Sequence, residues 1–161
     1  VYSHFGYNLK ATEMQASIGC AQLEKLDSFT AARKANFKVL YNGLKDLQDY
    51  LTLPVATENS DPSWFGFLIT VKDGVDRNAL VKFIESHNIQ TRMLFASNML
   101  LHPCFDQMRE EGTGYRVVGD LPNTDTILNK TFWIGVGPIM TSDKLNYMVQ
   151  TIKDYFEQQH N

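Results

Sequence analysis

Apolar residues recur every three to four positions through the first third of the chain, which is the spacing of one helix face. Thr12-Glu13-Met14-Gln15 fits a capping box, in which the Thr12 hydroxyl and the Gln15 side chain cap the start of a helix reciprocally. The stripe is strongest at Phe37, Leu40, Tyr41, Leu44, Leu47 and Leu51. The pattern over 12–50 predicts one long helix, or two helices with a joint near 28–30.

Small residues occupy the other faces of the early part of this helical region. They are Ala16, Ser17, Gly19 and Ala21, and they leave room for a neighbouring backbone to approach closely. The region is therefore expected to pack tightly against another segment or another chain.

The pattern then shifts to aromatic and β-branched runs separated by shorter helical stretches. Strands are predicted over 64–71, 89–95 and 131–136. Helices are predicted from the cap Asp76 to His87, from Pro122 to about Lys130, and from Thr141 or Ser142 onward. This order predicts an α+β fold of two layers, a small, mainly antiparallel three-stranded sheet with helices on one face. Residues 1–50 are expected to form a linking loop and long helix, and 51–161 a small α+β domain.

Composition narrows the function classes. The chain has 161 residues, 43% hydrophobic and 20% charged, with a net charge of −3. This is enough apolar material for a core, and no basic face favours nucleic-acid binding. No apolar run reaches the roughly 20 residues of a membrane helix. Cys20 and Cys104 form no ligand-spaced pair, so they are predicted to be buried, reduced thiols of a cytoplasmic protein, and no metal site is expected.

Two clusters carry candidate chemistry. Asn8 and Lys10 precede a helix N-terminus, where free N–H groups favour an anion such as phosphate. The alternative is an Asx turn beside a solvated lysine.

The second cluster begins with Arg92 in an otherwise apolar strand. Its guanidinium is able to fork two hydrogen bonds to a phosphate or carboxylate, and Phe95, Asn98 and His102 follow in the next loop. The alternative is an edge-strand arginine paired with an acidic side chain.

The stretch GYNLKATEMQASIGCAQLEKLD (6–27) resembles the signature of the DegT/StrS-type nucleotide-sugar aminotransferases, which are fold-type I pyridoxal phosphate enzymes. The segments TRMLFASNMLLHPCF (91–105) and LPNTDTILNKTFWIGVGPIMTSDKLNYMV (121–149) are most similar to the branch of CDP-4-keto-6-deoxyglucose 3-dehydrases of lipopolysaccharide O-antigen biosynthesis. The resemblance implies the C-terminal portion of a longer enzyme, as does a start at Val1 without a Met.

The resemblance also implies roles for particular residues. Asn8 would reach the cofactor phosphate of the partner subunit in a homodimer, with Lys10 near the same site. Arg92, Phe95, Asn98 and His102 would line the nucleotide-sugar site. The family's aminotransferases commonly carry a His at the position of Leu100, and its absence favours the dehydrase.

Three functions remain open on these grounds. The first is the C-terminal domain of a pyridoxamine- or pyridoxal-phosphate-dependent 3-dehydrase, with room for a [2Fe–2S] cluster whose ligands lie outside this chain and for a reductase partner. The second is a nucleotide-sugar aminotransferase. The third is a stand-alone α+β dimerisation module. No catalytic residue is expected within the chain, so the chain alone is expected to be inactive.

Overall fold

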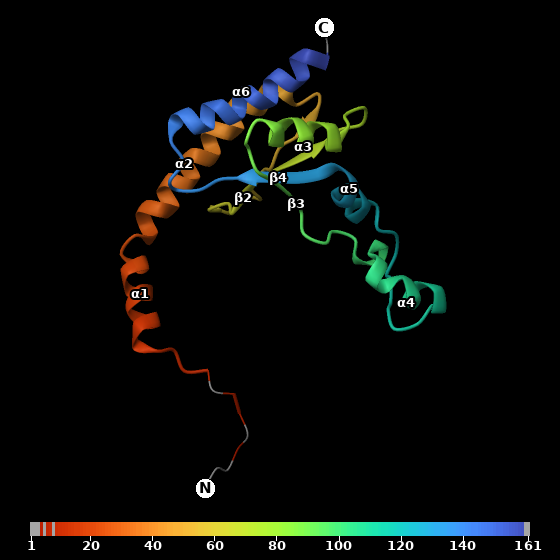
Figure 1. Ribbon diagram of the computed structural model, residues 1–161, viewed down its shortest axis with the longest axis horizontal. Helices are drawn as coiled ribbons and strands as arrows, with labels where there is room; N and C mark the ends of the chain where they lie inside the picture. Colours follow the sequence, from red (N-terminus) through yellow and green to blue (C-terminus); the bar gives the residue numbers. More distant parts are fainter. Residues whose placement is uncertain (1–3, 5, 8, 160–161) are drawn as a thin grey trace.

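An antiparallel sheet lies at the centre of the fold in this computed structural model, which describes residues 4, 6–7 and 9–159 (Figure 1). The order across the sheet is β1-β2-β4-β3. The strands are β1 (Leu51–Thr52), β2 (Gly66–Val71), β3 (Thr91–Met93) and β4 (Thr131–Gly135). The α+β fold is as predicted, but the number of strands is not. The two residues of β1 are too short to show alternation, and their pairing with the end of β2 comes from tertiary contact.

Helices lie on one face of this sheet and beside its end. The α-helices are α1 (Glu13–Leu23), α2 (Leu26–Leu44), α3 (Arg77–Ser86), α4 (Asp106–Glu111), α5 (Pro122–Lys130) and α6 (Ser142–Gln159). Short 3₁₀ turns are η1 (Lys45–Leu47), η2 (Met99–Leu101) and η3 (Pro103–Phe105). Helices α2, α3 and α6 cover one face of the sheet, whereas α5 lies beside the start of β4 and α4 lies beyond α5 (Figure 1). The predicted capping box at Thr12 and the cap at Asp76 are both confirmed.

The helical region predicted over 12–50 consists of two helices, α1 and α2, which was one of the two alternatives predicted. The joint lies at Glu24 and Lys25, earlier than the predicted 28–30. The Lys25 N–H donates to the Gln22 carbonyl at 3.1 Å, which is a tighter turn than an α-helix makes. No Gly or Pro marks this joint, so the sequence carries no local signal for it.

The core lies between α2, α3, α6 and the covered face of the sheet. Leu40 and Leu44 of α2 are fully buried, together with Phe67, Phe132 and Ile152 from β2, β4 and α6. The second half of α2 therefore shares the core of the α+β domain. The division of the chain at residue 50 stays a prediction.

Helix α1 extends away from this core (Figure 1). None of its residues is buried, and Met14 and Ile18 keep 77% and 64% of their surface exposed. The prediction that both cysteines are buried is wrong: Cys20 of α1 and Cys104 of η3 are exposed. Their apolar neighbours in sequence lie on segments that do not enter the core. No helix among the described residues is long and apolar enough to cross a membrane.

Candidate functional site

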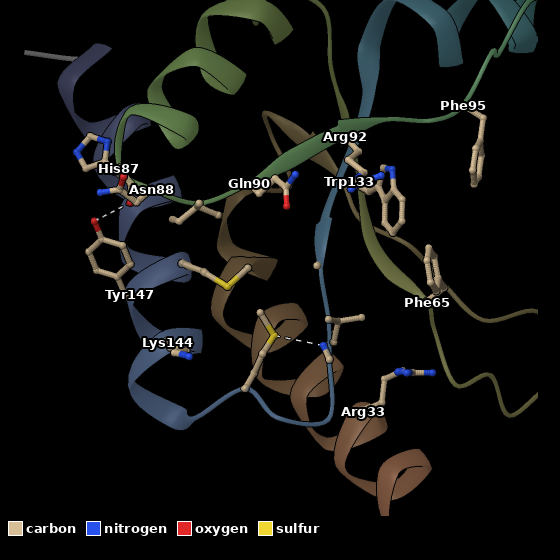
Figure 2. A pocket seen from close by; sticks show the side chains of 16 residues that line it. Arg33, Phe65, His87, Asn88, Gln90, Arg92, Phe95, Trp133, Lys144 and Tyr147 are labelled. Atoms are coloured by element: carbon tan, nitrogen blue, oxygen red, sulfur yellow. Dashed lines mark hydrogen bonds between the residues drawn. The ribbon is translucent and has the colours of Figure 1, made fainter. Parts of the chain in front are cut away.

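A groove of about 1000 Å³ opens along the uncovered face and the β3 edge of the sheet (Figure 2). Its walls come from segments far apart in the chain: α2 contributes Arg33, the strands contribute Arg92 and Trp133, and α6 contributes Lys144 and Tyr147. The loop between α3 and β3 completes one side. The groove exists only once these elements have packed.

Strand alternation places the groove residues. Phe132 and Ile134 of β4 point into the core and are fully buried, so Trp133 between them points to the uncovered face. Arg92 is the register partner of Trp133 on β3, and these two side chains therefore share that face. Figure 2 shows both side chains along the groove.

Trp133 lies at the middle of an aromatic cluster. Its ring centroid is 4.9 Å from that of Phe65 and 6.3 Å from that of Phe95. Its Nε1–H donates to the Met93 carbonyl at 3.2 Å. The indole ring covers Gly66 so closely that a Cβ built there would lie 1.7 Å from the ring. The absence of a side chain at Gly66 is what lets the indole lie flat on the sheet.

Hydrogen bonds between elements hold the groove walls. The Tyr147 hydroxyl donates to the His87 carbonyl at 3.1 Å, which ties α6 to the loop after α3. The Asn36 Nδ2 donates to the Gly137 carbonyl at 2.8 Å, which ties α2 to the loop after β4. These two bonds fix α6 and α2 against loops that also line the groove.

The charge of the groove is positive. Arg33, Arg92 and Lys144 line it, and no carboxylate does. Elsewhere among the described residues, cations do meet carboxylates. Lys130, for example, donates a hydrogen bond to Asp73 that holds the pKa of this exposed carboxyl below its usual value. A carboxylate-free set of cations in a groove favours an anionic ligand.

Two of the predicted substrate residues meet in this groove. Arg92 and Phe95 both line it, and Phe95 is 80% exposed. Phe95 also has a positive φ of 46°, which is rare for a non-glycine residue. The chain leaves the direction of β3 at this position. The alternative of an ion-paired Arg92 finds no support, because none of the salt bridges found among the described residues involves it.

The other two predicted substrate residues hold the loop that follows. Asn98 is 5% exposed, and its Nδ2 donates to Asp125 Oδ1 at 2.7 Å while its Oδ1 accepts from the Leu100 N–H at 3.1 Å. The His102 Nε2 lies 2.7 Å from the Ala96 carbonyl. Both side chains thus have partners within the chain and lie outside the groove lining. Their contact with substrate stays a prediction.

Asn98→Ala is expected to lower the free energy of unfolding by roughly 1–2 kcal/mol, because it removes a helix cap and leaves Asp125 Oδ1 without its partner. Urea denaturation of the chain measures this. Asn146→Ala, at an exposed position on α6, is the control and should change stability by less than about 0.5 kcal/mol. Equal stability of Asn98→Ala and the unchanged chain would contradict the anchoring role.

The predicted cofactor residues are less well placed. Asn8 lies outside the described residues, and Lys10 is exposed on the extended segment before α1. The buried side-chain atoms without a hydrogen bond among the described residues are Arg33 Nε and Ser63 Oγ, both far along the chain from Lys10. A single exposed lysine does not make a phosphate site, so the described residues do not by themselves fit pyridoxal phosphate. They also contain no group of three His, Cys, Asp or Glu able to hold a metal ion.

Arg33, Phe65 and Trp133 are groove residues that sequence analysis missed. Trp133 had a signal, because strict alternation with Phe132 and Ile134 places a large aromatic ring on the face without helices. Phe65, which directly precedes β2, had a weaker sequence signal. Arg33 had none, since a basic residue on a helix of mixed polarity ordinarily faces solvent.

Comparison with known proteins identifies the family. A model of the DegT/DnrJ/EryC1/StrS aminotransferase family matches residues 1–153. The chain belongs to this family. The match extends from the segment before α1 into α6, so it includes every element that builds the groove.

Relatives within the family are similar over nearly the whole chain. The lipopolysaccharide biosynthesis protein RfbH of Salmonella typhimurium is 52% identical over 157 residues, which cover 96% of this chain and 35% of that protein. The dTDP-4-dehydro-2,6-dideoxy-D-glucose 3-dehydratase of Saccharopolyspora spinosa is 46% identical over 156 residues, covering 96% and 32%. The chain thus spans about a third of the length of these curated relatives.

A solved structure agrees with this. The E. coli GDP-4-keto-6-deoxy-D-mannose-3-dehydratase with bound hydrated PLP superimposes with a TM-score of 0.77 at 28% identity, covering 91% of this chain and 36% of that one. The predicted likeness to a domain of fold-type I enzymes is confirmed.

Proposed function

We propose that this chain forms the substrate-facing domain of a nucleotide-sugar 3-dehydratase that works with pyridoxamine or pyridoxal phosphate in lipopolysaccharide biosynthesis. The observation that carries the proposal is the 52% and 46% identity to RfbH and to a 3-dehydratase over 96% of the chain. The positive groove supports it, because a nucleotide sugar carries two phosphates, and Arg92, whose guanidinium is suited to bind phosphate, lines the groove.

The cofactor belongs to the same proposal. The solved E. coli relative holds PLP, and when bound such a group supplies the electron sink for removal of the sugar hydroxyl. Asn8 and Lys10 are proposed to contribute to a cofactor site that other residues complete, across a homodimer interface. A [2Fe–2S] cluster and a reductase partner are the remaining elements of the proposal, and the cluster ligands would lie outside this chain.

A sugar transaminase is the second candidate. The observation in its favour is the dTDP-4-amino-4,6-dideoxy-D-glucose transaminase of Shigella dysenteriae, which is 27% identical over 150 residues. The higher identity to dehydratases and the presence of Leu100 favour the first candidate. Mass spectrometry of a nucleotide 4-keto-6-deoxyhexose incubated with glutamate, a two-electron reductant and the enzyme that contains this chain separates the two candidates. Replacement of the C3 hydroxyl by hydrogen, with the electrons supplied by the reductant or by glutamate, supports the dehydratase, and amino transfer from glutamate supports the transaminase. If neither product forms, both candidates are contradicted.

Arg92→Ala is expected to raise the KM for the nucleotide sugar in that enzyme roughly 10- to 100-fold, because a charge-assisted hydrogen bond to phosphate is lost. Steady-state kinetics measures the change. Arg116→Ala removes an exposed arginine outside the groove and should leave KM unchanged. Wild-type KM in Arg92→Ala would remove Arg92 from the substrate site.

A further inference from the structure

Strand β3 carries Arg92 at a weakly held position in the sheet. The strand has three residues and lies at the edge, where it pairs with β4 alone. A strand this short has few ladder hydrogen bonds to fix its register, and a slip by one residue would turn Arg92 to the covered face. The orientation of Arg92 therefore depends on contacts from outside the ladder.

The residues on either side of Arg92 point to the opposite face. Thr91 and Met93 are the register partners of Ile134 and Phe132 on β4, and both partners are fully buried in the core. Residues paired across two strands share a face of the sheet. Thr91 and Met93 thus point to the face that helix α3 covers (Figure 1).

Helix α3 contacts this strand at both of its ends. At the start of β3, the Thr91 hydroxyl donates to Glu85 Oε1 at 2.5 Å. At the end of β3, Arg77 Nη1 donates to Met93 Sδ at 2.7 Å. Arg77 is the first residue of α3 and Glu85 lies in its last turn. One helix therefore clamps the edge strand on both sides of Arg92.

Arg77 also links this strand to its neighbour. Its Nη1 donates to the Thr131 carbonyl at the start of β4 at 3.2 Å. The Met93 carbonyl in turn accepts from the Phe95 N–H at 2.8 Å and from the Trp133 Nε1–H at 3.2 Å. No salt bridge among the described residues involves Arg77. Its guanidinium is thus committed to neutral acceptors at the end of β3 and the start of β4.

We propose that Arg77 and Glu85 are positioning residues for Arg92, which together hold the edge strand so that Arg92 faces the anionic substrate. Neither residue is among those that line the groove, so neither contacts the substrate there. The inference rests on the proposed function for the substrate role of Arg92. It adds two residues outside the site on which substrate affinity depends.

Steady-state kinetics of the enzyme that contains this chain tests the clamp. Arg77→Met removes the guanidinium and keeps an unbranched side chain, and Glu85→Ala removes the acceptor of the Thr91 hydroxyl. Each change is expected to raise the KM for the nucleotide sugar roughly three- to tenfold and to change kcat less than about twofold. A loss of folded enzyme alone would lower the apparent kcat and leave KM unchanged, so the split separates positioning from stability.

Two matched variants serve as controls. Glu85→Gln keeps a side-chain oxygen that accepts from the Thr91 hydroxyl, so its KM should stay within about twofold of that of the unchanged enzyme. Lys82→Met removes a cation from an exposed position on the same helix, outside the groove lining, and should leave KM unchanged. The two Glu85 variants keep the test decisive if Arg77→Met does not fold.

A double-mutant cycle shows whether Arg77 acts through Arg92. If it does, Arg77→Met raises KM in the unchanged enzyme but not in the enzyme that already carries Arg92→Ala. A direct contact between Arg77 and the substrate would instead give the same rise in both.

Four results would overturn the clamp. They are an unchanged KM in either Arg77→Met or Glu85→Ala, an equal KM in Glu85→Gln and Glu85→Ala, a rise from Arg77→Met that persists in Arg92→Ala, and an unchanged KM in Arg92→Ala itself. The proposed function survives each of them as long as the sugar loses its C3 hydroxyl. Amino transfer would contradict the proposed function, whereas the expected pattern of KM values would still support the clamp.

Discussion

Phe132→Ala is expected to lower the free energy of unfolding by roughly 3–5 kcal/mol. Phe132 is fully buried on β4, which pairs with β2 on one side and β3 on the other, so its ring contributes to the centre of the core. Removal of the ring leaves a cavity that two flanking strands cannot close. Because a domain of this size has roughly 5–15 kcal/mol of stability in total, urea denaturation should show a large shift of the midpoint.

Two further variants make this result interpretable. Phe95→Ala removes the same side chain from a site that is 80% exposed, and stability should change by no more than about 0.5 kcal/mol. Phe132→Leu keeps most of the volume and should fold even if Phe132→Ala does not. A Phe132→Ala chain as stable as Phe95→Ala would show that the covered face of the sheet is not the core.

Gly66→Ala is expected to destabilise the fold by roughly 1–3 kcal/mol and to displace the indole of Trp133. The added Cβ would lie 1.7 Å from the Trp133 ring, and a rigid indole has no flexible end that could yield. Either the ring leaves the sheet surface or the strand shifts. In a chain that also carries Trp64→Phe, Trp133 is the only tryptophan, and a red shift of its emission would show that the ring has left the sheet surface. Urea denaturation would measure the loss of stability in either case.

Gly135→Ala is the matched control, since Gly135 is the register partner of Gly66 on β4 and a Cβ there would meet nothing within 4 Å. This variant should be as stable as the unchanged chain, or slightly more so, because alanine restricts the unfolded chain more than glycine does. If Gly66→Ala kept the emission and stability of the Gly135→Ala chain, the close approach of Trp133 to the sheet would be refuted.

Phe132→Ala tests the covered face of β4, and Gly66→Ala tests the uncovered face of β4 through Trp133. Phe132 and Trp133 are adjacent in sequence, yet Phe132 lies in the core and Trp133 lines the groove. This division explains why an aromatic residue remains on a face that no helix covers at that point. Helix α5 lies beside the end of the sheet at Thr131, and Thr131 is only 1% exposed. The uncovered face of β4 is therefore open around Trp133 and closed at Thr131.

Much of the fold was predictable from local pattern. The capping box at Thr12, the cap at Asp76 and the helix start at Pro122 are each specified by residues within four positions, and all three are confirmed. The joint at Lys25 and the two-residue strand β1 were not predictable, because neither has a local signal. The burial of the cysteines was predicted wrongly, because apolar sequence neighbours do not reveal whether a segment enters the core.

The candidate site was likewise predictable only in part. Arg92 and Phe95 were predicted and do line the groove, because their strand and the loop after it run along its edge. Asn98 and His102 were predicted to meet the substrate from their residue types and from the family resemblance, and this contact stays a prediction. The structure gives their polar atoms partners in Asp125, Leu100 and Ala96, an anchoring role that residue type alone does not reveal.

The sequence by itself determined the periodicities, the caps and the family signature, because each depends on residues close together in the chain. Only the tertiary structure decided that Arg33 of α2 reaches the same groove as Trp133, one hundred residues further along. That meeting depends on α2 packing beside α6 over the sheet and on Gly66 admitting the indole. Long-range packing of this kind is the property that sequence periodicity does not encode.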